Sequence, residues 1–452
     1  MSNNIVLKKG LSVPVDGTPA PFVSRPVLPP VVAIQPDDFK GLKPRLLVKE
    51  GDRVLAGTPV LADKVCTDIL VTSPVSGTVK EVVRGDKRKL LAVLVETDSA
   101  QEFYDFGASD PAATGADELK SLLLRSGLWL SLVQRPYGII ADPSAAPKGI
   151  FVSTFSSAPL APDSDFVYGD ALDEMQAAVT ALSGIAPVHV GVCARRGEAF
   201  RKLKDCSLYS VSGRHPAGNV GVQISHISPI RKGETVWTVG PAQLVAIGRL
   251  LRKGRVELRR KVAVTGPMAI EPSYVETVPG MPMSCLAPNG ACAEGVRVVS
   301  GDILSGRNAG AQGYLGWYDN QVTLVREGTD EEWFGWANPL RLNQFSVDHS
   351  YFHWCLKPLL GKRRYAMDTN LHGGPRAFVM SDGYYAKVLP MDIYPLYLTK
   401  ACLASDIDKM EKFGIYEVLP EDLATCEFID PSKNNIQSII ADGIDLMLKE
   451  MA

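Results

Sequence analysis

The sequence of 452 residues contains no run of about eighteen apolar residues, the length that a helix needs to cross a bilayer. Its most apolar stretch, residues 122–133, is too short and is interrupted by Arg125. The N-terminus, MSNNIVLKKG, lacks the long apolar core of a signal peptide. These absences argue against membrane-spanning and exported proteins, and they predict a cytoplasmic protein, either free or docked on a membrane.

Cysteine pairs and an excess of charge are also missing. The eight cysteines form no C-x-x-C pair, and without an export signal we expect reduced thiols. A net charge of −2 gives no overall attraction for nucleic acid, so none is expected as a partner. Local basic clusters at residues 84–89, 252–261 and 362–364 are interpreted as solvated surface, with contact to acidic lipid headgroups or to another protein of a complex as the alternative.

A segment near the C-terminus has the flanks of a ferredoxin-type iron–sulfur loop but not its ligands. A bacterial ferredoxin run is C-x2-C-x2-C-x3-C-P, in which thiolates hold the cluster. Counting back from Pro431, the ligand positions hold Asp430, Cys426, Leu423 and Pro420. Only Cys426 keeps a thiol, so this run alone cannot form a [4Fe–4S] cluster.

Loops that bind flavin or nicotinamide phosphates are missing as well. Flavin- and NADH-binding subunits of electron-transfer complexes use a glycine-rich loop before a helix, whose backbone N–H groups approach the phosphates. The corresponding residues 126–132 contain one glycine and the bulky Trp129, and residues 158–163 lack the glutamate of the usual acidic loop. We expect no FMN or NADH bound in the usual manner.

The sequence assigns no catalytic or metal-binding residue. His349 and His353 lie four residues apart, but the glutamate of an HExxH zinc motif is missing, so packing or capping is favoured over metal binding. His189 lies inside an apolar strand and is interpreted as a core histidine. The spaced glycines in residues 310–316 precede no convincing helix and predict a β-turn region. No Ser/His/Asp or Cys/His arrangement is local, and distant pairs stay open.

The clearest motif that is present spans residues 48–79 and resembles the biotinyl/lipoyl carrier domain, a small sandwich of short strands. Its glycines, Gly51, Gly57 and Gly77, stand where turns need a positive φ or a close backbone approach. A carrier presents its modified lysine between two methionines, a fixed short distance before an Ala/Ser-Pro turn. Here Lys64 lies between Asp63 and Val65, and its distance along the chain from the Ser73-Pro74 turn is about two residues too long. We interpret the module as structure without carrier chemistry; the alternative is a modified Lys64.

The remaining pattern predicts a multidomain protein that combines α/β and α+β units. Residues 1–100 hold a proline-rich, extended lead-in to about residue 36 and the biotinyl/lipoyl-like barrel-sandwich. In residues 101–255, a helix at 118–124, a strand at 149–154, an amphipathic helix at 170–182 and a strand at 187–192 predict a mainly parallel, Rossmann-like sheet.

The last two units differ in type. Residues 256–329 show short strands at 262–265, 274–278, 296–300 and 322–325. Their Thr-Gly, Pro-Gly and glycine-rich turns resemble the soluble-ligand-binding β-grasp domain. Residues 330–452 predict a helical C-terminal domain that contains the degenerate ferredoxin-like run, with apolar residues at helical spacing over 396–413 and 435–450.

Over nearly the whole chain, these pieces resemble the A-type subunit of the bacterial Na+-translocating NADH:quinone oxidoreductases (Na+-NQR). The matching residues include 7–11 with Pro14, Gly17 and Pro19, then 48–52 and 73–88, and in the tail Gly373, 376–379, Tyr385, Val388, Pro390, 392–393 and Pro395. Gly374-Pro375 departs from the Ser-His usual in that family, and His372 lies two residues earlier. The related C-type subunit of Rnf complexes keeps its clusters, so the missing cysteines favour Na+-NQR.

The resemblance implies a non-redox, peripheral subunit on the cytoplasmic side of a bacterial inner membrane. It implies five other subunits, B to F, as partners that carry FAD, FMN, riboflavin and iron–sulfur centres, and a complex that couples NADH oxidation and quinone reduction to Na+ export. This chain is expected to bind no cofactor of its own. For a contribution to quinone binding, the aromatic stretch 333–336 with His349 and His353 would supply an apolar slot and hydrogen-bond donors; a core or subunit-contact patch is the alternative.

Two other classes of protein are alternatives to the hypothesis of a non-redox subunit. A stand-alone soluble ligand-binding protein would use the β-grasp domain for a cobalamin-like or glycan ligand. The glycan case needs an export signal or a lipid-attachment cysteine, and the sequence offers neither. An acyl or biotin carrier enzyme is disfavoured by the surroundings of Lys64.

Overall fold

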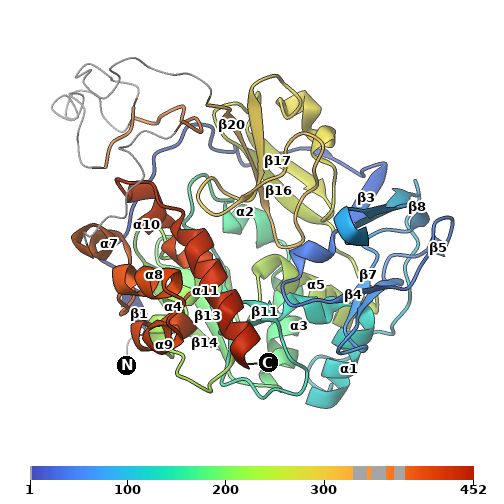
Figure 1. Ribbon diagram of the computed structural model, residues 1–452. Coiled ribbons are helices and arrows are strands. Elements are labelled where there is room, and N and C mark those ends of the chain that lie inside the picture. Colours follow the sequence, from blue (N-terminus) through green and yellow to red (C-terminus); the bar gives the residue numbers. More distant parts are fainter. Residues whose placement is uncertain (1–2, 329–343, 348–362, 371–381, 452) are drawn as a thin grey trace.

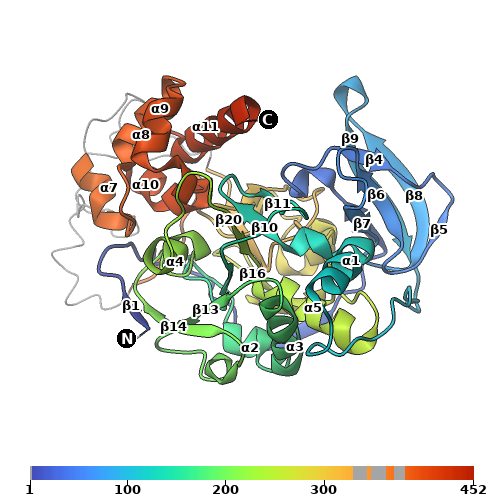
Figure 2. The ribbon, with the colours of Figure 1, turned by 90° about the horizontal axis from the view of Figure 1, so that it is seen from below.

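The computed structural model describes residues 3–328, 344–347, 363–370 and 382–451. Four β-sheets organise the described part of the chain. Figures 1 and 2 place strands β5 (Arg53–Val54) and β8 (Gly77–Arg84) at one end of the molecule and helices α7 (Asp382–Val388), α8 (Pro395–Leu403) and α9 (Ile407–Phe413) at the opposite end. Among the described helices, none combines the length and the apolar character needed to cross a membrane.

The N-terminal unit is a barrel-sandwich of two small antiparallel sheets. One sheet has the order β3 (Val31–Ile34), β9 (Leu90–Thr97), β8 (Gly77–Arg84) and β5 (Arg53–Val54); the other has β4 (Pro44–Leu46), β6 (Pro59–Asp63) and β7 (Leu70–Thr72). Gly51 and Gly57 have φ of +89° and +98°, and a Cβ at Gly77 would overlap the carbonyl oxygen of Glu96. The sequence predicted this module and the reason for its three glycines correctly.

The second unit contains a seven-stranded sheet in the order β1-β14-β13-β12-β15-β10-β11. Its strands are β1 (Asn4–Val6), β10 (Val133–Arg135), β11 (Ile139–Ile140), β12 (Ile150–Ser153), β13 (Val188–Cys193), β14 (Ser207–Ser212) and β15 (Val236–Thr238). The pairs from β1 through β15 in this order are parallel, and β10 is antiparallel to both of its neighbours. The strands predicted at 149–154 and 187–192 correspond to β12 and β13.

Helices cover both faces of this sheet. Its helices are α1 (Ala116–Ser126), α2 (Ser164–Tyr168), α3 (Leu172–Ser183), α4 (Val220–Ile227) and α5 (Pro241–Lys253). Ile150 and Val152 share a core with α3 and α5, whereas Phe151 packs with Ile224 of α4. Because side chains alternate along a strand, α4 lies on the face opposite α3 and α5.

The third unit is a six-stranded mixed sheet in the order β19-β18-β20-β16-β17-β2. Its strands are β2 (Val23–Pro26), β16 (Arg260–Thr265), β17 (Ser273–Thr277), β18 (Val296–Ser300), β19 (Arg307–Asn308) and β20 (Gln321–Arg326). One face of the sheet packs on a core that includes Val264, Met281, Leu286 and Leu324. The four strands predicted in this region correspond to β16, β17, β18 and β20.

The described C-terminal residues form helices whose core also includes Val211 of β14 and Val222 of α4. The helices are α7 (Asp382–Val388), α8 (Pro395–Leu403), α9 (Ile407–Phe413), α10 (Ala424–Ile429) and α11 (Ile436–Met451). The helical pattern over 396–413 is divided between α8 and α9. Ser405 adopts φ +54°, and the Asp406 side chain accepts a hydrogen bond from the Lys409 amide as the N-cap of α9. A local break of this kind leaves the apolar spacing intact, which is why spacing alone does not reveal it.

The N-terminal segment is more than the extended lead-in that the sequence predicted. Its strand β1 pairs with β14, β2 pairs with β17, and β3 pairs with β9. Leu7, Leu11 and Val15, between β1 and β2, lie in the core of the C-terminal helices. One short segment therefore contributes to all the described units, and only its last strand belongs to the barrel-sandwich.

Candidate functional site

A cavity of about 460 Å³ lies between the six-stranded sheet and the C-terminal helices. Strands, a turn, a helix and short stretches of chain surround it. The lining residues are Arg297, Val299, Ile303, Leu304, Gly306, Asn308, Val325, Gln344, Phe345, Ala366, Met367, Asp368, Thr369, Asn370, Ala424, Glu427, Phe428, Lys433, Asn434 and Asn435. The volume and the mixed apolar and polar lining are those of a small-molecule site.

The sheet forms one wall because side chains alternate along its strands. Arg297 and Val299 of β18 line the cavity, whereas Val298 between them lies in the core on the other face. Val325 of β20 is paired with Arg297, and Asn308 of β19 is paired with Val299, so both add to the same wall. At this corner of the sheet, the face opposite the core of the third unit borders the cavity.

The opposite wall comes from α10 and the chain that follows it. Ala424, Glu427 and Phe428 stand at helical spacing and share one face of α10. The ring of Phe345 stacks on that of Phe428, with centroids 6.3 Å apart and an interplanar angle of 29°. The Lys433 ammonium lies 5.7 Å from the centroid of Phe428 and donates a hydrogen bond to the Phe428 carbonyl at 2.7 Å. This wall offers a flat aromatic surface beside a cation.

Hydrogen bonds hold the charges of the sheet wall and of α10 in place. Arg297 forms a forked pair with Glu327, whose carboxylate also accepts from Thr369 at 3.0 Å. The hydrogen bond from Arg297 holds the pKa of Glu327 below its usual value. Glu427 accepts from the Gln437 amide at 2.7 Å. Within the described residues no nucleophile–base pair lies in this lining, so the arrangement suits binding and orientation rather than acid–base chemistry.

Cys426, singled out from the sequence, lies on α10 but does not line the cavity. It is fully buried in the core of the C-terminal helices, and burial raises the pKa of its thiol. Of the other positions in the run, Leu423 packs in the same core and Asp430 accepts hydrogen bonds from Asn434. In the described part of the chain, no three His, Cys, Asp or Glu residues gather as a metal site would need.

The degenerate flavin loop at residues 126–132 is packed into the core. Gly127 ends α1 with φ +75°, and a Cβ there would overlap the side chain of Thr72 from the barrel-sandwich. Trp129 is fully buried, donates to the carbonyl of Ala141 at 2.7 Å, and meets the ring of Trp237 edge-on. The bulk of Trp129 fills the space beneath this turn.

The other described positions that the sequence singled out lie away from the cavity. His189, predicted to be a core histidine, is only half-buried in β13, where its ring stacks on Phe151. Lys64 is exposed on the connection between β6 and β7. Residues 310–316 form a turn and extended chain, as predicted. Residues 333–336, His349, His353 and 371–381 lie outside the described residues.

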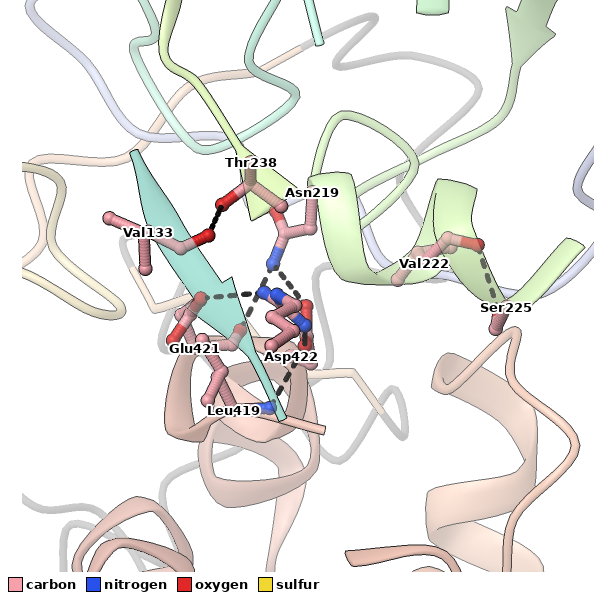
Figure 3. A network of polar contacts seen from close by, with 9 residues as sticks. Val133, Asn219, Val222, Ser225, Thr238, Leu419, Glu421 and Asp422 are labelled. Atoms are coloured by element: carbon pink, nitrogen blue, oxygen red, sulfur yellow. Dashed lines mark hydrogen bonds and ion pairs between the residues drawn. The ribbon is translucent and has the colours of Figure 1, made fainter. Parts of the chain in front are cut away.

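A buried ion pair that the sequence did not reveal ties the second unit to the C-terminal helices. Arg135 of β10 reaches Asp422 at 2.8 Å and Glu421 at 3.0 Å. Asn219, at the start of α4, donates to the carbonyl of Glu421 at 3.1 Å, as Figure 3 shows. The Leu419 amide donates to Asp422 as well. The partners are 286 and 287 residues apart, so no local pattern could reveal them.

Three family models match the chain, and together they cover most of it. The NqrA N-terminal barrel-sandwich hybrid domain matches residues 5–98, the NqrA second alpha/beta domain residues 114–256, and the NQRA C-terminal domain residues 261–311. The solved structure of an NAD+-reducing [NiFe]-hydrogenase aligns with 73% of this chain and 64% of its own at 10% identity, with a TM-score of 0.38, which is too low to bear on the fold.

Curated relatives match over nearly the full length of the chain. The protein from Rhodopirellula baltica, named as the A-type subunit of Na(+)-translocating NADH-quinone reductase, is 33% identical, with 98% of each chain covered. The proteins of the same name from Serratia proteamaculans and Shewanella frigidimarina are each 34% identical, with 99% of this chain and 100% of theirs covered. The chain therefore belongs to the NqrA family, the A-type subunits of the Na(+)-translocating NADH-quinone reductases.

Proposed function

We propose that this chain is the redox-inactive, peripheral member of a membrane complex that couples NADH oxidation and quinone reduction to Na+ export. The observation that carries the proposal is the full-length similarity to relatives named as the A-type subunit of that reductase. Its partners are then the subunits B to F, which hold the flavins and iron–sulfur centres. The complex lies in the bacterial inner membrane, with this chain on the cytoplasmic side.

In this role the chain supplies binding surfaces rather than redox groups. Cys426 is the single thiol of its run and lies inside a core, and Trp129 fills the turn where a flavin loop would need open backbone. Neither region fits its usual cofactor. We therefore propose that the chain holds no flavin, nicotinamide or iron–sulfur group of its own.

The cavity between β18 and α10 is our candidate for the contribution to quinone binding. A quinone ring is flat and largely apolar and carries two carbonyl acceptors. Phe428 and Phe345 offer a flat surface, Ile303 and Leu304 an apolar edge, and Asn308 an amide for a carbonyl oxygen. The stretch 333–336 with His349 and His353 lies outside the described residues, so its role in quinone binding stays a prediction.

The finer fold assignments belong to the same proposal. Parallel strands with helices on both faces support a Rossmann-like second domain, and the mixed sheet supports a β-grasp third domain. The helices α7 to α11 support a helical C-terminal domain. The proposed boundaries are 1–100, 101–255, 256–329 and 330–452; the matched ranges 5–98 and 261–311 fall inside the first and third, and 114–256 passes the end of the second by one residue, which supports the division.

The role in the complex is tested by purifying the tagged chain from native membranes in mild detergent. Mass spectrometry is expected to find the other reductase subunits in stoichiometric amounts, several of them with many membrane spans. Recovery of the chain alone in the soluble fraction would overturn the proposal.

The cavity is tested in the purified complex with Phe428→Ala. Loss of the stacking surface is expected to raise KM for quinone about 10-fold, equivalent to roughly 1.4 kcal/mol, and to leave KM for NADH unchanged. Phe413→Ala, in an aromatic cluster with Tyr394 and Tyr397 outside the cavity, is the matched control. An unchanged KM for quinone in an intact Phe428→Ala complex removes the cavity from the proposal and leaves the role in the complex standing.

A further inference from the structure

The hairpin of β8 and β9 in the barrel-sandwich ends in a basic tip, residues 84–89. Figure 2 shows the loop that joins the two strands projecting from the barrel-sandwich. Asp86 is the one acidic residue among these six positions. The exposed cations of the tip are Arg84, Lys87, Arg88 and Lys89. The sequence alone allows either solvated surface or contact with an acidic partner here, and the backbone of the tip distinguishes the two.

The backbone at the tip forms a turn that suits other residue types. The Lys89 amide donates to the carbonyl of Asp86 at 3.0 Å. Both residues between them have a positive φ, +52° at Lys87 and +61° at Arg88. These are the features of a type I′ turn, for which hairpins prefer Asn-Gly, because a larger side chain strains the left-handed backbone. The fold therefore gains nothing from having a lysine and an arginine at these two positions.

The side chains of the two turn residues do not serve the packing of the described chain either. Lys87 and Arg88 are exposed, and neither side chain makes a hydrogen bond, an ion pair or a ring contact with any described residue. Their neighbours hold the turn in shape. Arg84 donates to the carbonyl of Arg88 at 3.2 Å, and Lys89 pairs with Asp37 at 2.7 Å. The tip therefore directs two cations outward from a defined turn.

The surroundings of the tip favour lipid headgroups over a folded protein as the partner. A stable protein interface buries about 800 Å² on each side around an apolar centre. The large apolar side chain beside the tip is Leu91, which is 39% exposed and lies where a Cβ on Gly85 would meet it. A narrow charged tip with one such neighbour suits a fluid anionic surface, where each cation adds to binding without a matched partner group.

We propose that the tip, residues 84–89, contacts the anionic phospholipid headgroups of the membrane in which the complex lies. The inference rests on the proposed peripheral role, because that role brings the chain close to a bilayer. Lys87 and Arg88 make the contact, Arg84 and Lys89 position the turn, and Leu91 adds an apolar contact beside them. The barrel-sandwich, which resembles a carrier module without carrier chemistry, then acts as a membrane contact.

The test is cosedimentation of the full chain with vesicles of phosphatidylcholine, with and without phosphatidylglycerol. The wild type is expected to bind the anionic vesicles and to leave them at high salt, which screens exposed charges. Lys87→Asn with Arg88→Gly gives the turn its preferred sequence and removes both charges. Binding is expected to fall about 25-fold, since each cation contributes about 5-fold. The Tm is expected to rise by roughly 1–2 °C, so a folding defect cannot mimic the result.

Lys8→Asn with Lys9→Asn is the matched control. Both lysines are exposed and follow β1, which lies far from β8 in Figure 1, and the change in net charge is the same. This variant is expected to bind anionic vesicles like the wild type. Equal weakening in the two double variants, or a wild type that does not bind anionic vesicles, overturns the proposal.

Purification of the complex separates a lipid from a protein partner. The chain with Lys87→Asn and Arg88→Gly is expected to recover the other reductase subunits as the wild type does. Loss of those subunits together with unchanged vesicle binding would assign the tip to a protein partner and overturn the proposal. Vesicle binding needs no other subunit, so its outcome is independent of whether the wild type assembles into the complex.

Discussion

The buried ion pair of Arg135 and Asp422 joins the second unit to the C-terminal part of the chain, so a single substitution at Asp422 is expected to lower stability. The two side chains are 2% and 0% exposed and lie 2.8 Å apart. Removing Asp422 leaves the buried Arg135 with only Glu421, whose side chain is 41% exposed, so we expect a large part of the roughly 3–5 kcal/mol that breaking a buried pair costs. We expect Asp422→Ala to lower the free energy of unfolding by about this amount, measured by urea denaturation.

Two comparisons isolate the charge from the loss of packing. Replacing both partners, Arg135→Met with Asp422→Leu, is expected to recover most of the lost stability, since an apolar pair leaves no buried charge. Lys409→Ala removes an ion pair with Asp406 that lies at the surface and is expected to have almost no effect. A single Asp422→Ala variant as stable as the wild type would contradict the importance of the pair.

A second residue, Asp38, links stability to pH. Burial raises the pKa of Asp38 from 3.8 to about 6, although Arg307 at 3.2 Å and the Trp317 amide at 3.0 Å favour its charged form and Asp319 opposes it. A folded pKa above the unfolded value means that the linked stability is present below about pH 4 and is lost as pH rises through about 6.

The corresponding test compares Asp38→Asn with the wild type. The shift of about two units is equivalent to roughly 3 kcal/mol, so the variant should gain on the wild type between pH 4 and 6. The measurement is Tm against pH for both proteins. Parallel curves across this range would show that Asp38 does not titrate with the raised pKa.

At the scale of elements, local patterns predicted those strands and helices that carry a clear periodicity of their own. The helix expected at 170–182 is α3, and the strand expected at 187–192 is β13. The division between α8 and α9 escaped prediction because a cap residue breaks the backbone without changing the apolar spacing. The pairing of β1 and β2 escaped because short strands at sheet edges carry almost no periodicity of their own.

The N-terminal segment crosses the third unit at Gly17, where its backbone contacts that of Gly266. Gly17 has φ +88°, its carbonyl accepts from the Gly266 amide at 3.0 Å, and a Cβ there would overlap the Gly266 backbone. Gly51 has nearly the same φ, +89°, but open space around it. We expect Gly51→Ala to cost about 1–2 kcal/mol from the left-handed backbone alone.

Gly17→Ala carries that same cost and must also displace the Gly266 backbone, so we expect a clearly larger loss. Both variants are measured by urea denaturation against the wild type. Equal losses in the two variants would mean that the close approach at Gly17 adds nothing.

For the whole molecule, the sequence predicted a mixed α/β multidomain chain with an N-terminal barrel-sandwich, but not the site between its units. The cavity joins β18, the turn before β19 and α10, which are far apart in the chain. Motif reasoning sees residues that are near in sequence, so a site assembled by tertiary packing leaves no local signal. The loss of ligands from the ferredoxin-like run and from the flavin loop could be recognised because those ligands lie close together in the sequence.

The path of the N-terminal segment also predicts how the molecule unfolds. Residues 4–34 add one strand to each of three sheets, and Leu7 to Val15 join the core of the C-terminal helices. Lys40 pairs with Asp445 of α11 as a further link. Melting one unit therefore removes contacts from the others, and we expect calorimetry of the full chain to show one endotherm. A variant without residues 1–26 loses β1 and β2 but keeps β3, and should melt in separate steps. Several resolved transitions in the full chain would show that the segment lies along the units without coupling them.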